Sequence, residues 1–278
     1  MTLFVFGLGY AARAIVAAAG GVAVGTTRDG RGDSLRYDDA EAVRAGLAAS
    51  ARVLVSIPPD ADGDPVLRDY VGRFGADLLA GKWVGYLSST GVYGDVGGAW
   101  VDERAPADRG RRAKRNAADA AWLARGAHVF RLPGIYGPGR SALERVARGE
   151  AHRTGIEGQV FSRVHVDDIA GGVVAAFDAP AGAYNLSDDE PASQDAVVDY
   201  AARLLDVVPP PFVSLDQLSP MARGFYAENR RVANNKAKRV LGWRPRFPDY
   251  RFGLRAVSAM TSPAPASTPP AAASSDQR

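Results

Sequence analysis

The sequence predicts an α/β fold with a doubly wound parallel sheet and a small C-terminal lobe. Short apolar runs alternate with alanine-rich stretches through the first half of the chain, as strands and helices do in such a sheet. The apolar runs contain almost no polar alternation, which is typical of strands covered by helices on both faces. After Pro133 the sequence changes to loops rich in glycine and proline with separate helical segments, which predicts the small lobe.

The predicted elements of the first half follow in a regular order. The strands are expected at Leu3 to Phe6, Val22 to Thr26, Val53 to Ile57, Trp83 to Ser88 and His128 to Leu132. The helices between them are expected over 10–19, 40–49, 64–80 and 111–125.

The second half predicts fewer strands and more loops. We expect helices over 141–148, 168–177 and 193–206, with a short strand over 183–186 and a proline run that ends the last helix. The expected domains are residues 1–165, which hold most of the sheet, a smaller lobe over 166–261 that is interleaved with it, and a disordered tail over 262–278.

Composition excludes several classes of protein. The chain has 278 residues, no cysteine, three histidines and a formal net charge of +3. The missing cysteines exclude disulfides and thiolate metal sites, and three histidines leave little material for another kind of metal site, so we expect no metal. The small net charge and the lack of aromatic residues among the basic clusters do not favour nucleic acid.

The start of the chain and its hydropathy indicate a cellular location. The sequence opens directly with the apolar run MTLFVFG, without a basic segment or a cleavage site of small residues. No stretch approaches 18 uninterrupted apolar residues, so we expect a cytoplasmic protein with no membrane contact.

A glycine turn follows the first strand. Gly7-Leu8-Gly9-Tyr10-Ala11-Ala12 fits the pattern G-x-G-x-x-A at a junction of strand and helix. Gly7 permits the tight turn, Gly9 lets the backbone approach a pyrophosphate, and Ala12 allows close packing of the helix. Glycine turns are common, but the position of this one favours a nucleotide site over a plain turn, and hence a Rossmann-type NAD(P)-binding fold.

The end of the second strand favours NADP(H) over NAD(H). A site for NAD usually has a carboxylate about 20 residues after the glycine turn, where it binds the ribose hydroxyls. This chain has Thr26, Thr27 and Arg28 there, and a guanidinium suits a 2′-phosphate. A solvated surface Arg28 is the structural alternative. Asp38 is explained by helix capping, with an adenine contact as the second interpretation.

A polar segment, LSSTGVYGDVGGAW, covers residues 87–100 and raises a question about its role. Its hydroxyl groups close the predicted strand, so they form either the polar edge of an active site or only a strand end with a turn. The carboxyl end of a central strand is where open α/β sheets bind ligands, which favours the first interpretation.

The order of motifs along the chain resembles that of a known superfamily. The motifs are G-x-G-x-x-A, SSTGVYGD at 88–95, RLPGIYGPGR at 131–140, VHVDD at 164–168, YNLSDDEPAS at 184–193 and LGWRPRFPDYRFGL at 241–254. The series is similar to the extended short-chain dehydrogenase/reductase superfamily, in its NAD(P)-dependent epimerase/dehydratase branch, and covers about residues 2–256.

The resemblance implies roles for individual residues. It assigns to Ser89 the hydroxyl that polarises the substrate oxygen, and it places the loop that begins at Pro133 along the nicotinamide, with Pro58 as a further cofactor contact. Arg140 and His165 are expected to face the substrate. The structural alternatives are that Ser89 only caps a strand and that His165 is a core histidine.

The family's acid/base pair is missing from the matching helix. In the family a tyrosine and a lysine four residues later face the nicotinamide ribose. The corresponding segment, RGRRAKRNAADAAW at 109–122, contains no tyrosine and places Arg111 and Arg115 at the two positions, or Gly110 and Lys114 in a register one residue earlier. An arginine stays protonated and cannot abstract a proton.

This departure leaves two interpretations of the basic segment and two substitute acids. Arg111 and its neighbours form either a solvated basic face or an anion clamp for a substrate or cofactor phosphate. Tyr93 and Tyr136 are candidate substitutes for the missing tyrosine, although a phenol with an ordinary pKa near 10 is a poor base at neutral pH.

Two classes of function follow. The first is an NAD(P)-dependent oxidoreductase of epimerase/dehydratase type that transfers hydride to or from a small polar or sugar-like substrate. The second is a sensor or scaffold protein that binds NADP(H) without turnover, which the missing tyrosine favours. Helices beside the central sheet often pair between protomers in this family, so the resemblance also allows a homodimer.

Overall fold

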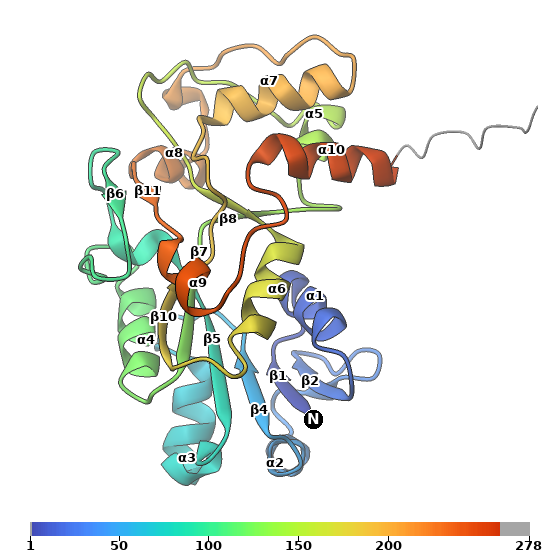
Figure 1. Ribbon diagram of the computed structural model, residues 1–278, viewed down its shortest axis with the longest axis vertical. Helices are drawn as coiled ribbons and strands as arrows, with labels where there is room; N and C mark the ends of the chain where they lie inside the picture. Colours follow the sequence, from blue (N-terminus) through green and yellow to red (C-terminus); the bar gives the residue numbers. More distant parts are fainter. Residues whose placement is uncertain (1, 262–278) are drawn as a thin grey trace, which may run out of the picture.

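A central sheet of seven parallel strands organises the protein, whose computed structural model describes residues 2–261 (Figure 1). The strand order is β10-β7-β5-β4-β1-β2-β3. The strands are β1 (Leu3–Phe6), β2 (Ala23–Thr27), β3 (Leu35–Arg36), β4 (Arg52–Val55), β5 (Trp83–Ser89), β7 (His128–Leu132) and β10 (Gly182–Asn185). This arrangement confirms the predicted doubly wound sheet, with its reversal of strand order between β1 and β4.

Alternate residues of each strand are buried on opposite faces of the sheet. Leu3 and Val5 of β1 pack with α1 (Tyr10–Ala19) and α6 (Val166–Ala175). Phe4 and Phe6 pack on the other face. The helices of that face are α2 (Ala40–Ala48) and α4 (Ala113–Leu123). Helices on both faces explain why the strands read as continuous apolar runs.

The helix predicted over 64–80 forms only over 65–74, because the segment breaks at Gly75. A π-helical turn at Leu67–Val71 leads into α3 (Gly72–Phe74), and the 3₁₀ turn η2 (Ala76–Leu79) follows. The φ of +90° at Gly75 is incompatible with a helix and is tolerated by glycine.

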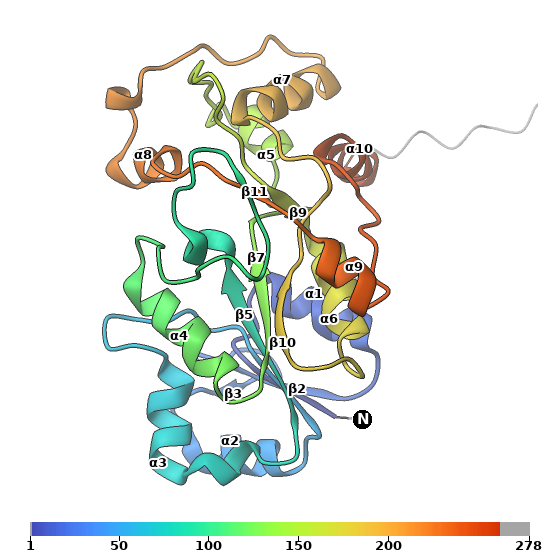
Figure 2. The ribbon, with the colours of Figure 1, turned by 60° about the vertical axis from the view of Figure 1, so that its left-hand side comes forward.

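The small lobe lies beyond the carboxyl ends of the strands (Figure 2). Its core is formed by α5 (Ala142–Ala147), α7 (Gln194–Leu204) and α10 (Tyr250–Thr261), which pack around Tyr136. Two further helices, α8 (Pro220–Tyr226) and α9 (Asn235–Val240), follow α7, and the turn η4 (Leu215–Gln217) precedes α8.

Two short parallel strand pairs connect distant parts of the chain. The strand β8 (Gly134–Tyr136) pairs with β9 (Arg163–His165), and β6 (Trp100–Val101) pairs with β11 (Arg231–Val232). The 3₁₀ turn η3 (Thr90–Tyr93) follows β5 and leads to β6.

The two lobes exchange segments. The strand β10 and the helix α6 join the central sheet although they follow residue 165, whereas α5 precedes that residue and packs in the small lobe. The tail expected to be disordered over 262–278 lies outside the described residues. No helix within residues 2–261 is both long and apolar enough to cross a membrane.

Candidate active site

The glycine turn leaves an open backbone surface in front of α1. Gly7 has a φ of +89°, and a Cβ atom there would lie 2.7 Å from Ile57, so only glycine fits. Its amide donates a hydrogen bond of 3.1 Å to the hydroxyl of the fully buried Thr26. Gly9 caps α1, and no atom lies within 4 Å of where its side chain would begin. A pyrophosphate can therefore approach the amino end of this helix.

The other residues expected near the cofactor lie in different surroundings. Ala12 is fully buried against the sheet, which permits the close helix packing. Arg28 is exposed directly after β2 and makes no salt bridge with a described residue. Asp38 accepts two hydrogen bonds from Arg36, of 3.0 and 2.8 Å, and this guanidinium lowers the pKa of Asp38 below its usual range.

One cavity of about 1150 Å³ connects the glycine turn with the small lobe. Gly9, Pro58, Ser89 and Pro133 line its cofactor end, where β1, β4, β5 and β7 finish. Tyr226 of α8 lies at the other end. Open α/β sheets bind ligands beside the reversal of strand order, which is where this cavity lies.

Ser89 and Tyr93 occupy different sides of the cavity wall. The hydroxyl of Ser89 accepts a hydrogen bond of 3.1 Å from the Gly91 amide and lines the cavity. Tyr93 is 1% exposed, donates to Asn185 Oδ1 at 2.7 Å and accepts from Arg131 at 3.1 Å. Burial raises the pKa of Tyr93 to about 12. Tyr93 thus lies behind the wall, in a network that satisfies its hydroxyl.

A buried ion pair supports this wall and was missed by sequence reasoning. Arg131 of β7 contacts Asp119 of α4 at 2.7 Å, and Ser88 donates to the same carboxylate at 2.6 Å. The side chains of Arg131 and Asp119 are 3% and 1% exposed. The signal that could have revealed the pair was a single arginine within an otherwise apolar strand.

Two arginines at the start of α4 join the two lobes and contact β5. Arg111 donates from Nε to Glu228 Oε1 at 2.9 Å and also to the Gly224 carbonyl. Arg115 donates to the Tyr86 hydroxyl at 3.0 Å and to the Leu87 carbonyl at 3.3 Å. Both arginines line the cavity, at the positions that the resemblance assigns to tyrosine and lysine.

Arg140 lies near the cofactor end of the cavity. Its guanidinium is 5.8 Å from the centre of the Tyr10 ring. The Tyr10 hydroxyl donates to the Pro138 carbonyl at 3.0 Å, which ties this loop to the start of α1. Arg140 and Tyr10 both line the cavity.

His165 packs beneath the cavity floor, against Tyr136. His165 is 2% exposed, is not among the lining residues, and caps α6 by accepting from the Asp167 amide at 3.2 Å. Its ring lies 5.2 Å from that of Tyr136 and 4.1 Å from that of Phe247, and burial lowers its pKa. Tyr136 borders the cavity, but burial raises its pKa well above the usual value.

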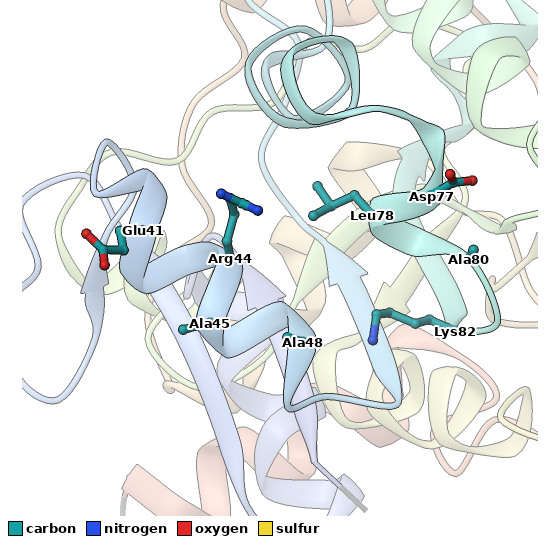
Figure 3. A pocket seen from close by; sticks show the side chains of 8 residues that line it. All are labelled: Glu41, Arg44, Ala45, Ala48, Asp77, Leu78, Ala80 and Lys82. Carbon is teal, nitrogen blue, oxygen red and sulfur yellow. The ribbon is translucent and has the colours of Figure 1, made fainter.

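A second hollow, of about 570 Å³, lies at the amino ends of β4 and β5 (Figure 3). The helix α2 supplies Glu41 and Arg44, and the segment around η2 supplies Asp77 and Lys82. It is at the opposite edge of the sheet from the glycine turn and is lined by charges of both signs. The larger cavity is therefore the candidate active site.

Comparison with solved structures finds proteins with the same fold. A functionally unknown conserved protein from Silicibacter pomeroyi DSS is 42% identical, with a TM-score of 0.80 over 94% of this chain and 99% of that chain. The human epimerase family protein SDR39U1, solved with NADPH, is 17% identical, with a TM-score of 0.71 over 93% and 99% of the two chains. A dTDP-glucose 4,6-dehydratase from Bacillus anthracis, solved with NAD, is 14% identical, with a TM-score of 0.74 over 94% and 96%.

Curated proteins match only part of the chain. A 3-diazoavenalumate denitrifying reductase from Streptomyces is 34% identical over 138 residues, and protein YeeZ from Escherichia coli is 30% identical over 173 residues. These matches cover 45% and 59% of this chain and 45% and 58% of the relatives, so the chain spans about half the length of the curated relatives it matches. No family model matches the sequence.

Proposed function

We propose that this chain, which belongs to the same family as the functionally unknown Silicibacter pomeroyi protein, is an NAD(P)-dependent oxidoreductase. Its fold is that of the extended short-chain dehydrogenase/reductases of the epimerase/dehydratase branch. The substrate is a small polar or sugar-like molecule. The observation that carries this proposal is the cavity of about 1150 Å³, which runs from Gly9 past Ser89 to the small lobe. It offers space for a nucleotide and a substrate side by side.

The cofactor residues fit NADP(H). Gly7, Gly9 and Ala12 form the turn and the packing that a pyrophosphate requires, and Thr26 holds that turn through the Gly7 amide. Arg28 is exposed after β2 and has no salt bridge within residues 2–261, so it supplies a cation where a 2′-phosphate would lie. Pro58 and Pro133 border the nicotinamide end. A bound nicotinamide would supply or accept hydride at this end of the cavity.

Ser89 and Arg115 are the groups best placed to act on the substrate oxygen. Ser89 lines the cavity, and its hydroxyl would polarise that oxygen. Arg115 contacts the carbonyl of Leu87, two residues earlier in the same strand, so its charge lies beside the same wall. A guanidinium stabilises negative charge on oxygen but does not remove a proton, so the pair favours reduction of a carbonyl, with water as the proton source.

A sensor that binds NADP(H) without turnover is the second candidate. The buried bonds of Tyr93 to Asn185 and Arg131 favour it, because they leave this phenol no contact with the cavity. Such a protein binds oxidised and reduced cofactor in two conformations or with different partner affinity.

Titration with NADPH and NADH, followed by energy transfer from tryptophan to nicotinamide, tests the shared premise. Tighter binding of NADPH supports the cofactor site and the role of Arg28. Binding of neither nucleotide would overturn both candidates. A screen of carbonyl substrates then separates them, since turnover with any of these substrates excludes the sensor.

A further inference from the structure

The cavity lining carries a large excess of positive charge. Eight arginines and one carboxylate, Glu228, are among its residues. The arginines are Arg111, Arg112, Arg115, Arg140, Arg145, Arg148, Arg163 and Arg230. A cavity lined by one sign of charge attracts ligands of the opposite sign.

Several of these arginines already have partners. Glu228 is shared by Arg111, at 2.9 Å, and Arg230, at 2.7 Å. Arg148 pairs with Glu150 at 3.0 Å.

Two more arginines bond to neutral acceptors of the chain. Arg163 donates to the carbonyls of Phe161 and Ala192, at 2.8 Å each, and so fixes the floor of the small lobe. Arg115 donates to Tyr86 and Leu87 at the opposite, cofactor end. Neither set of side-chain hydrogen bonds includes a carboxylate, although the buried Asp188 interacts electrostatically with Arg163.

Arg145, like Arg112, Arg115, Arg140 and Arg163, has no salt bridge to a carboxylate among the described residues, but of these five it is the one whose charge acts on both His152 and Tyr226. It lies on α5, is accessible from the cavity, and has Arg148 one turn further along the same chain segment. Desolvation lowers the pKa of Arg145 most strongly, Tyr226 and Glu150 raise it, and the like charge of Arg148 lowers it. The side chain is exposed, so its guanidinium is open to pair with an anion.

A polar and aromatic wall lies next to Arg145. His152 Nε2 is 3.4 Å from the Tyr226 hydroxyl, and the Tyr226 ring packs edge-to-face on Phe161 with centroids 5.6 Å apart. His152, Phe161 and Tyr226 all line the cavity. Burial and the charge of Arg145 lower the pKa of His152, so this imidazole offers neutral hydrogen bonding.

We propose that Arg145 binds an anionic group of the substrate, a carboxylate or a phosphate, while the wall of Phe161 and Tyr226 receives a flat apolar body attached to it. The site rests on the proposed function, because it specifies the substrate class for the same cavity. The anion lies in the small lobe, and the group to be reduced reaches toward Ser89.

Calorimetric titration of the NADPH-loaded protein with small probes tests this site. Benzoate and phenyl phosphate supply an anion on an aromatic ring, benzamide supplies the ring without charge, and acetate and inorganic phosphate supply the charge without the ring. Benzoate or phenyl phosphate is expected to bind about tenfold or more tightly than benzamide and the two small anions, and the tighter of the two identifies carboxylate or phosphate.

Variants distinguish binding of the anion at Arg145 from general attraction by the positive charge of the protein. Arg145→Gln is expected to weaken the preferred aromatic anion about tenfold or more, with Arg145→Lys retaining part of the affinity. Arg203→Gln, an exposed arginine of α7 outside the cavity, is the matched control and is expected to leave binding unchanged. Wild-type affinity in Arg145→Gln, an equal loss in the control, or equal binding of benzamide would each overturn the proposal.

The same titrations keep this inference distinct from the proposed function. NADPH affinity of Arg145→Gln, measured alone, is expected to match that of the wild type and shows that the variant is folded. Aromatic anions that bind a protein with no affinity for NADPH or NADH would support the site while removing the oxidoreductase proposal. NADPH binding without anion binding would do the reverse.

Discussion

Arg111 and Glu228 join the start of α4 to the segment after α8 through a hydrogen bond of 2.9 Å between Nε and Oε1. Arg111 occupies the position of the catalytic tyrosine in one of the two registers that the resemblance allows. Its second contact, with the Gly224 carbonyl, lies in α8 itself. The residue in the tyrosine's place therefore fixes α8 over the cavity, a geometric role that requires no proton transfer.

Replacing Arg111 with glutamine is expected to loosen α8. The carboxylate of Glu228 then keeps Arg230 and the backbone amide of residue 111, and the Gly224 carbonyl loses the guanidinium donor. Hydrogen exchange of the amides over 220–228 is expected to become faster, while NADPH affinity stays near that of the wild type. Arg109→Gln, an exposed neighbour, is the control. Unchanged exchange in Arg111→Gln would show that α8 is held by its apolar packing alone.

Arg28→Gln is expected to abolish the preference for NADPH. A charge-assisted contact with a 2′-phosphate is worth about one to two powers of ten in affinity, and NADH lacks that phosphate. The dissociation constants of both nucleotides check this, with NADH expected to bind variant and wild type equally. A parallel loss of NADH affinity would instead indicate that Arg28 supports the fold of the turn after β2.

Ser89→Ala is expected to lower kcat by about a hundredfold with little change in cofactor affinity, because it removes a donor to the reacting oxygen. The same change leaves the Gly91 amide without its partner, which costs about 1 kcal/mol of stability. Ser89→Thr retains a hydroxyl and is expected to recover part of the activity. Full turnover by the alanine variant would assign Ser89 to strand capping only.

The strands and the helices that cover the sheet were predictable, because apolar periodicity is local. The bounds of β1, β7 and α1 match the expected ones, and the others agree within a few residues. The end of the helix over 65–74 at Gly75 was not predicted, since one glycine with a positive φ decided it against a helical pattern. The pairing of β6 with β11 joins residues 100 and 231, a relationship that no local pattern contains.

The candidate site was predictable only where motifs are contiguous. Gly9, Ser89 and Pro133 belong to recognisable segments, and all three line the cavity. Arg145 and Tyr226 come from helices about 80 residues apart, and each alone reads as an ordinary surface residue. Their neighbourhood follows from the packing of the small lobe, whose helices over 141–148 and 193–206 were predicted but whose α8 and α10 were not.

The buried pair of Arg131 and Asp119 predicts a large loss of stability for single changes. Asp119→Asn leaves the guanidinium of Arg131 buried without a counter-charge, which costs about 3–5 kcal/mol. Denaturant unfolding measures this, and Arg104→Ala, which breaks the exposed pair of Arg104 with Asp102, is expected to change nothing measurable. The double change Asp119→Leu with Arg131→Met is expected to recover part of the loss, and a double variant less stable than Asp119→Asn would contradict this account.

Asp168 makes the stability of the closing segment depend on pH. Its carboxylate accepts from the amides of Arg246, at 2.6 Å, and Phe247, at 3.1 Å, yet burial raises its pKa from 3.8 to about 6. Between these two values the folded protein holds a proton that the unfolded chain has released, so the free energy of unfolding falls as pH rises through that window. The full difference corresponds to about 3 kcal/mol.

Unfolding of the wild type and of Asp168→Asn between pH 4 and 7 isolates this contribution. The asparagine does not titrate, so the stability of the wild type relative to the variant is expected to decline across the window and then level off above about pH 6. Asp216→Asn, an exposed change in η4, controls for the loss of one charge. A constant difference between wild type and Asp168→Asn would mean that the two amide hydrogen bonds hold the carboxylate ionised throughout, against the effect of burial.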